Sequence, residues 1–251
     1  MRLAADALGR GLGDALAPYG LNLVGVAAVD AYDALVPARY RLHDTHDAVR
    51  SVMVIGNGGG AFWEACRAYL GRHPELEAHA HPLDAFTRDV VETHVATALA
   101  RGGIRGVLRF PFDRDEPPLS FVHLAEAAGL GRRSLLGLLV HPEFGPWMAL
   151  RAALLLERPA QAARPAAGFD PCATCAERPC IAACPAAAIA ASGWDVERCV
   201  THRLAAEGNC DDACHARVAC VYGVAHRYPP EATAYHQGRA RQVMDAHRGG
   251  G

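Results

Sequence analysis

Apolar positions recur with two different periods along the first 158 residues. Between residues 3 and 18 the apolar side chains fall at helical spacing, as Leu3, Ala7, Leu8, Leu12 and Leu16 show. Short segments rich in apolar residues predict strands at residues 21–29, 51–57, 105–110 and 138–141, of which the first two are expected to be buried. Further helices are predicted at residues 62–69, 83–100 and 119–128. Residues 147–156 are apolar apart from Arg151, which allows either a strand or a helix.

The order of these elements predicts the domain organisation. Strands that alternate with helices indicate an α/β layered domain over residues 1–160. Residues 161–168 are rich in proline and alanine and predict a linker. A cysteine-rich domain follows at residues 169–230, and residues 231–251 form a polar helix and tail.

Composition and charge argue against some classes of function. The chain is 51% hydrophobic, its net charge is −2, and all of its 25 basic residues are arginine. A chain without a surplus of positive charge is a poor candidate for broad nucleic-acid binding. The N-terminus lacks the apolar core of a signal peptide, and no run approaches the length of a membrane span. We therefore expect a cytoplasmic protein, in which clustered thiols favour metal over disulfides.

Eight of the nine cysteines lie between Cys172 and Cys220. Eight thiolates are the number that two 4Fe–4S clusters require, and the Cys184-Pro185 pair is typical of bacterial ferredoxins. In two-cluster ferredoxins the cysteine before the proline binds the other cluster. The sequence therefore predicts a bacterial-ferredoxin-like domain with two interleaved ligand sets. The first set is Cys172, Cys175, Cys180 and Cys220, and the second is Cys184, Cys199, Cys210 and Cys214.

Two other interpretations of the cysteines and nearby histidines remain open. Two four-cysteine zinc sites would also use eight thiolates, although zinc ribbons favour paired Cys-x2-Cys motifs and only Cys172 and Cys175 form one. Cys66, on a predicted helix, is expected to be a buried core thiol. His202, His215 and His226 are possible ligands in principle, but eight cysteines suffice without them.

Three stretches of the chain resemble the epoxyqueuosine reductase family. They are residues 21–27 (LNLVGVA), residues 127–147 (AAGLGRRSLLGLLVHPEFGPW) and the cysteine domain with its Cys-x3-Cys-Pro and Cys-Asp-Asp-x-Cys elements. The resemblance implies that the first domain is a nitroreductase-like α+β sandwich. It also implies a corrinoid (cobalamin), or alternatively a flavin, to which the two clusters pass electrons.

The resemblance also implies candidate residues outside the cysteine domain. Asp115 stands fourteen residues before Gly129, where the family has a proton-donating carboxylate, and a desolvating cofactor beside it would raise its pKa. The alternative is that Asp115 belongs to a solvated loop with its charged neighbours. Arg132, Arg133 and Ser134 are candidate cofactor-binding residues, with the arginines as a clamp for an anionic group. The alternative for the arginine pair is a surface turn.

Departures from the family limit what the resemblance implies. The family's Gly-Lys-Asn is replaced by Ser134, Leu135 and Leu136, its Glu-Arg pair by Phe121 and Val122, and its tRNA-binding helical repeats are missing. These losses argue against tRNA as a partner. The expected function is that of an iron–sulfur oxidoreductase. It would take electrons from an external donor, a ferredoxin, flavodoxin or reductase, and reduce a small molecule. The alternative is a ferredoxin-like electron-transfer adaptor whose first domain is degenerate.

Overall fold

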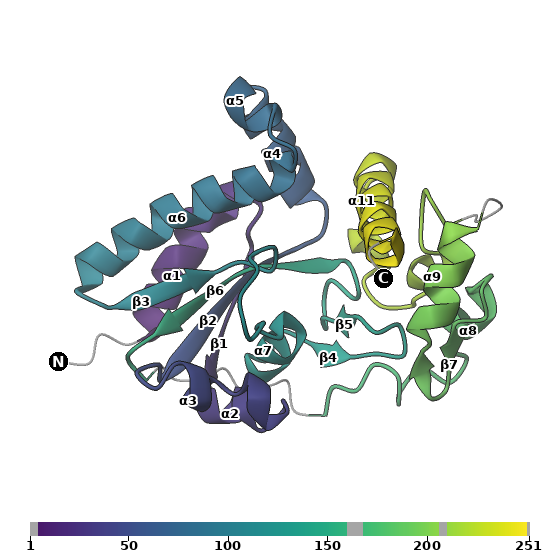
Figure 1. Ribbon diagram of the computed structural model, residues 1–251, viewed down its shortest axis with the longest axis horizontal. Coiled ribbons are helices and arrows are strands. Elements are labelled where there is room, and N and C mark those ends of the chain that lie inside the picture. The colour runs from purple at the N-terminus through teal and green to yellow at the C-terminus, as the bar shows by residue number, and fades with distance from the viewer. Residues whose placement is uncertain (1–4, 160–167, 206–209, 250–251) are drawn as a thin grey trace. The chain divides into compact units, whose positions relative to one another are not determined.

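The computed structural model describes residues 5–159, 168–205 and 210–249 (Figure 1). The chain forms two compact units. The first unit comprises residues 1–131 and 148–168, and the second comprises residues 132–147 and 169–251. The division differs from the expected one because residues 132–147 group with the cysteines. The predicted linker, residues 161–168, lies outside the described residues except for Gly168.

The first unit is built on a four-stranded sheet in which all neighbouring strands are antiparallel. In order across the sheet, the strands are β1 (Leu23–Ala28), β2 (Ser51–Gly58), β6 (Met148–Leu156) and β3 (Gly106–Arg109). Every residue of β2 is buried, because helices cover both faces of this central strand. The mixed α/β class is confirmed. The segment that allowed either a helix or a strand is β6, which pairs with both β2 and β3.

The helices of the first unit cover opposite faces of the sheet (Figure 1). Gly25 and Val54 pair across β1 and β2, so they point to the same face, and Met53 points to the other. A side chain at Gly25 would meet Leu130, 2.8 Å away, whereas Gly9 of α1 lies against Met53. The helices are α1 (Ala5–Leu16), α2 (Val29–Asp33), α3 (Leu42–Thr45), α4 (Ala61–Leu70), α5 (Pro74–Glu77), α6 (Pro82–Gly102) and α7 (Phe121–Ala127), with 3₁₀ turns η1 (Ala17–Tyr19) and η2 (Ala38–Tyr40).

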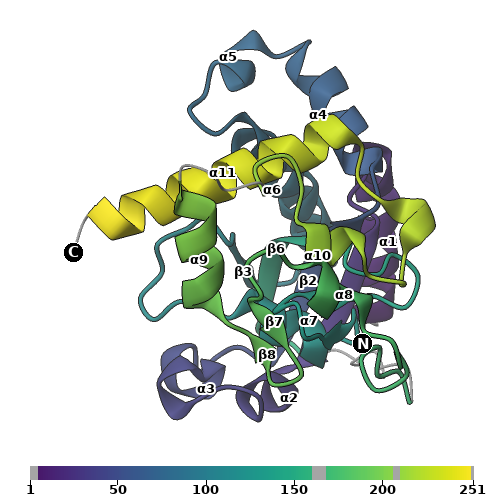
Figure 2. The same cartoon turned by 90° about the vertical axis from the view of Figure 1, so that its right-hand side faces the viewer.

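The second unit is made of short elements around the cysteines. One hairpin pairs β4 with β5, another pairs β7 with β8, and α9 packs against α11 (Figure 2). The elements are β4 (Arg132–Arg133), β5 (Leu139–Val140), α8 (Pro179–Ala183), β7 (Ile189–Ala190), β8 (Gly193–Trp194), α9 (Val196–Leu204), α10 (His215–Val218), η3 (Val224–His226) and α11 (Pro230–Gly249). Among the described helices, none is long and apolar enough to span a bilayer.

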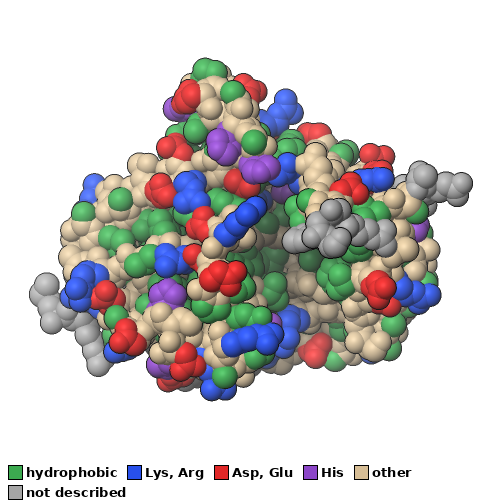
Figure 3. All heavy atoms as spheres, viewed as in Figure 1, with side chains coloured by type: hydrophobic (Ala, Val, Ile, Leu, Met, Phe, Trp, Pro, Cys, Tyr) green, Lys and Arg blue, Asp and Glu red, His purple; other side chains and the backbone are tan. Residues whose placement is uncertain are grey.

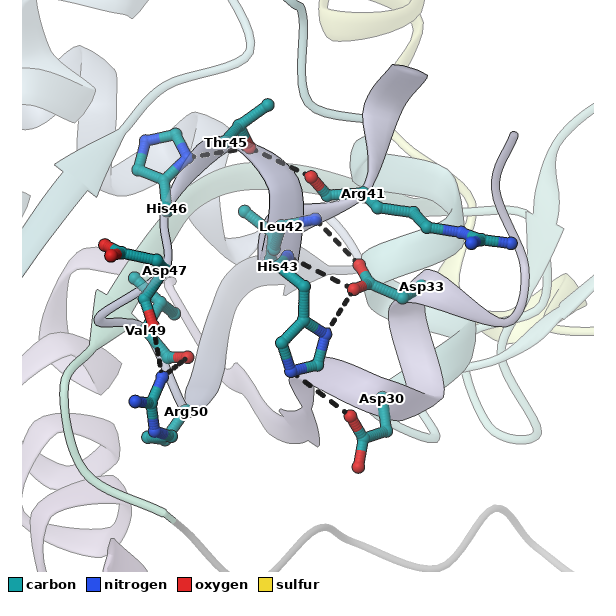
Figure 4. A network of polar contacts seen from close by, with 10 residues as sticks. All are labelled: Asp30, Asp33, Arg41, Leu42, His43, Thr45, His46, Asp47, Val49 and Arg50. Atoms are coloured by element: carbon teal, nitrogen blue, oxygen red, sulfur yellow. Dashed lines mark hydrogen bonds and ion pairs between the residues drawn. The ribbon is translucent and has the colours of Figure 1, made fainter. Parts of the chain in front are cut away.

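A buried carboxylate fastens the segment between β1 and β2 (Figure 4). Asp33, at the end of α2, accepts hydrogen bonds from the backbone N–H groups of Leu42, at 2.7 Å, and His43, at 3.2 Å. Its second oxygen also lies 2.6 Å from Nδ1 of His43, whose Nε2 lies 3.4 Å from Asp30. One side chain thus satisfies the free N–H groups that begin α3.

We expect the substitution Asp33→Asn to reduce the free energy of unfolding by about 2 kcal/mol, because the amide replaces one buried acceptor with a donor. Chemical denaturation followed by circular dichroism measures the loss. Asp44→Asn is the matched control, since Asp44 lies on the same short helix α3 and is exposed. Equal stabilities of the two variants would contradict a role for Asp33 in fastening α3.

Candidate metal centre

Four cysteines line a small cavity of about 30 Å³ in the second unit, called here the first cavity. They are Cys172, Cys175, Cys180 and Cys220. Asp170 shapes the loop that carries the first two, because its carboxylate accepts hydrogen bonds from the N–H groups of Cys172, at 3.1 Å, and Ala173, at 2.9 Å. The hydroxyl of Thr174 is 2.7 Å from that of Tyr222, which links this loop to the segment after Cys220.

The other four cysteines line a larger cavity of about 290 Å³, the second cavity. They are Cys184, Cys199, Cys210 and Cys214. Cys184 follows α8, Cys199 lies on α9, and Cys214 precedes α10. The rest of the lining is largely apolar, with Ile189, Trp194 and Met244 among the residues that border it.

The two cavities are neighbours. Leu136 lines both, and an apolar cluster of Leu136, Ile189 and Ala216 packs against cysteines of both sets. The five-residue helix α8 connects them, since Cys180 lies within it and Cys184 directly follows it in an extended conformation. The structure therefore brings together the same two groups of four cysteines that the spacing predicts.

The loop between Cys175 and Cys180 has four residues, where the bacterial ferredoxin run has two, and it is closed by a left-handed residue. Arg178 has φ of +43°, and Pro179 then opens α8. An arginine in this region of the backbone map is uncommon and costs of the order of 1 kcal/mol. The extra length of the loop relative to ferredoxins is thus absorbed before the helix begins, and Cys180 still borders the first cavity.

Burial and neighbouring thiols disfavour the thiolate form of two cysteines in each group. Burial raises the pKa of Cys180 and Cys220, and neighbouring thiols of the same set raise it further. Burial likewise raises the pKa of Cys199 and Cys210. All nine cysteines are free thiols. Crowded thiols of this kind are suited to a positively charged inorganic centre, which removes their protons and offsets their repulsion.

Within the described residues, no three or more His, Cys, Asp or Glu side chains are grouped to hold a single metal ion. This statement covers the histidines that gather near α5 in Figure 3. His79 and His81 line a separate cavity of about 500 Å³ in the first unit, together with Asp84 and Glu92 of α6. The two cysteine-lined cavities are therefore the candidate inorganic sites, each with four thiols around a space rather than around one point.

Backbone N–H groups and one side chain hydrogen-bond cysteine sulfurs. The N–H of Leu135 donates to Sγ of Cys172, 3.4 Å away, and the N–H of Ala188 donates to Sγ of Cys184, also 3.4 Å away. The side chain of Trp194 hydrogen-bonds Cys199, which lowers the pKa of that thiol against the larger effect of burial. Such bonds tune cluster potentials. Small residues between the cysteines, such as Ala188, let backbone N–H groups approach sulfur, whereas nothing in the sequence indicates a role for Trp194.

The candidate residues taken from the family lie in different units. Asp115, in the first unit, is partly exposed and forms an ion pair with Nε of Arg109, 3.3 Å away. Arg109 also lies 3.5 Å from Nε2 of His46. Asp113, two residues before Asp115, pairs with Arg88 and accepts from the N–H of Phe110. The loop of Asp115 is therefore held by charged partners.

Arg132, Arg133 and Ser134 belong to the hairpin of the second unit. Both arginines are exposed on β4. The hydroxyl of Ser134 donates to the carbonyl of Leu138, 2.8 Å away, so it stabilises the hairpin turn, and Ser134 also borders the first cavity. The residues expected to bind a small-molecule cofactor are thus part of the segment that supplies the N–H of Leu135 to Cys172.

Solved structures of low sequence identity share this fold. An epoxyqueuosine reductase from Streptococcus thermophilus matches 88% of this chain and 69% of its own, with a TM-score of 0.62 and 12% identity. The C. elegans B12-trafficking protein CblC matches 93% of this chain and 91% of its own, with a TM-score of 0.61 and 14% identity. A catabolic reductive dehalogenase matches 96% of this chain and 35% of its own, with a TM-score of 0.53 and 17% identity.

No family model and no curated protein matches the sequence itself. The resemblance to epoxyqueuosine reductase found from the sequence is confirmed at the level of the fold, because four solved structures of that enzyme share it at TM-scores from 0.59 to 0.63.

Proposed function

We propose that the protein is an iron–sulfur redox protein that passes electrons through two 4Fe–4S clusters to a corrinoid. The observation that carries the proposal is the pair of neighbouring cavities, each lined by four free cysteines. Soft thiolates in sets of four are the ligands of such clusters. The clusters would supply one-electron transfer, and the apolar lining of the second cavity would limit the access of water.

The corrinoid is proposed because proteins of this fold use or carry one. One neighbour is described as a B12-trafficking protein, and another as a reductive dehalogenase whose structure suggests B12-dependent dehalogenation. A flavin is the alternative cofactor. A low-potential one-electron carrier, a ferredoxin, flavodoxin or reductase, would be the electron donor, and a small molecule the substrate.

Asp115 is our candidate proton donor in this reaction. The Bacillus subtilis epoxyqueuosine reductase is described with a catalytic aspartate loop swung out of its active site, which shows that an aspartate on a loop serves that enzyme. In this chain Asp115 also lies on a loop and is paired with Arg109. A role as donor requires that the carboxyl be released from this ion pair and protonated, which a desolvated site would favour.

Anaerobic purification with iron, sulfide and zinc analysis tests the proposal. We expect about eight iron and about eight sulfide per chain, the content of two 4Fe–4S clusters, and paramagnetic resonance signals after reduction. Added cobalamin is expected to bind and to show the absorption spectrum of its base-off form. Zinc in place of iron after anaerobic preparation and reconstitution would overturn the cluster assignment.

The cofactor-binding measurement distinguishes the two functions that the sequence left open, an oxidoreductase with its own cofactor and an electron-transfer adaptor. If both clusters are present and neither cobalamin nor flavin binds, the corrinoid proposal is wrong and the electron-transfer adaptor is supported. If a corrinoid binds and the isolated chain turns over a small substrate with an artificial electron donor, the adaptor is excluded.

A further inference from the structure

Arg203 is a buried cation at the edge of the second cavity. It lies on α9, its side chain lines the cavity, and the residue is only 6% exposed. One guanidinium nitrogen donates to the carbonyl of Gln237 on α11, 2.7 Å away, which fixes the group in place. Its Nε is buried and has no hydrogen-bond partner among the described residues.

Of the described residues that line the second cavity, none is Asp or Glu. A buried guanidinium is costly unless its charge is compensated, so such groups are normally paired. Among the described residues that line the cavity with Arg203, those that can carry negative charge are thiols. Burial raises the pKa of Cys199 and Cys210, and the charge of Arg203 lowers it for both.

The first cavity differs in this respect. Its one arginine, Arg178, is partly exposed, so water screens its charge more strongly. Burial raises the pKa of Cys180, and the other influences on this thiol come from three cysteines of its own set and from a backbone hydrogen bond. Each cavity thus has four thiols of its own, but the electrostatic surroundings of the two sets differ.

We propose that Arg203 is the counter-ion of the cluster in the second cavity and makes that cluster the more easily reduced of the two. The inference rests on the proposed function. A cluster with four thiolates is anionic and gains a further negative charge when it accepts an electron from a one-electron donor, while the guanidinium stays protonated. A fixed positive charge therefore stabilises the reduced form more than the oxidised form. Electrons that enter at either cluster settle on the one beside Arg203.

The test is a redox titration of the reconstituted protein with dithionite, followed by paramagnetic resonance. We expect Arg203→Met to lower the ratio of reduced to oxidised second cluster about tenfold at a fixed potential, which corresponds to about 59 mV for a one-electron couple. The first cluster should shift much less. Arg203→Lys, which keeps the charge, should restore most of the ratio. Signals are assigned to the two clusters with Cys172→Ala and Cys184→Ala, which remove one ligand of each set.

Arg198→Met is the matched control. Arg198 lies on the same helix α9 but is exposed, so removal of its charge should leave both titrations nearly unchanged. If Arg203→Met holds both clusters with unchanged potentials, the inference is wrong and the proposed function stands. If iron is absent from the unsubstituted protein as well, the proposed function itself has failed.

Loss of the second cluster in a variant of Arg203 also tests the inference. If Arg203→Met and Arg203→Gln both lose the second cluster while Arg203→Lys retains it, the charge is required to hold the anionic cluster, which supports the counter-ion role. If all three variants lose it, Arg203 acts through its shape and packing, and the inference is overturned.

Discussion

Replacing Cys184 with alanine is expected to remove about half of the bound iron and sulfide, because it removes one of four ligands from a single cluster. The lost cluster should be the one in the second cavity, although Cys184 is only four residues from Cys180 of the first cavity. Cys180→Ala should also remove about half, but the remaining resonance signal should be that of the other cluster. Iron and sulfide analysis with paramagnetic resonance on both variants measures the difference.

The chain contains its own control for this experiment. Cys66 is buried in α4 of the first unit, and burial raises its pKa to about 12, so it remains a neutral thiol. Cys66→Ala should therefore keep the full iron content, with at most a modest loss of stability from the small cavity it creates. If Cys180→Ala and Cys184→Ala leave the same signal, the two ligand sets are not interleaved and the assignment of residues to clusters is wrong.

Continuous apolar segments were well predicted from the sequence, and locally polar ones were not. The run from Ser51 to Asn57 predicts a buried strand, and the observed strand β2 (Ser51–Gly58) is buried at all eight positions. Residues 147–156 carry no period, so only their pairing with β2 and β3 decides that they form a strand. Helices α2 and α3 were not predicted, since they are four or five residues long and are held by the distant contact from Asp33 to Leu42.

The grouping of the cysteines was predictable because spacing and the Cys-Pro pair restrict which thiols can converge. The structure brings together the same two sets, while cluster binding by them stays a prediction. Arg203 lies four residues after Cys199, on the same face of α9, but this helix was not predicted from the sequence. Trp194 and the N–H of Leu135 were not predicted either, because they reach sulfur only through tertiary contacts between hairpins and cysteine loops.

The grouping of residues 132–147 with the cysteines depends on two glycines that no local pattern reveals. Gly145 has φ of +57° and Gly223 has φ of +65°. A methyl group at Gly145 would overlap the carbonyl of Tyr222, and one at Gly223 would overlap the carbonyl of Phe144. The two backbone segments therefore cross in direct contact. This crossing fixes Tyr222, whose N–H hydrogen-bonds Cys220 and whose hydroxyl is bonded to Thr174.

Substitution of Gly145 by alanine is accordingly expected to cost about 3 kcal/mol in the free energy of unfolding, because a left-handed conformation and a backbone overlap both oppose it. The cluster of the first cavity should be lost before that of the second, since the displaced segment follows Cys220. Denaturation followed by tryptophan fluorescence, with Trp147 nearby and buried, measures the first effect, and paramagnetic resonance measures the second.

Two other glycines, Gly168 of the first unit and Gly238 of the second, distinguish the causes of this loss. Gly168 has φ of +79° but open space around it, so Gly168→Ala isolates the conformational cost and should lose only about 1 kcal/mol. Gly238 lies within α11, also with open space, and Gly238→Ala should be neutral or stabilise by up to about 1 kcal/mol. If Gly145→Ala loses no more than Gly168→Ala and keeps both clusters, the glycine crossing does not hold the first cavity together. Residues 132–147 would then owe their place among the cysteines to the packing of Trp147 against Tyr228 and Arg217.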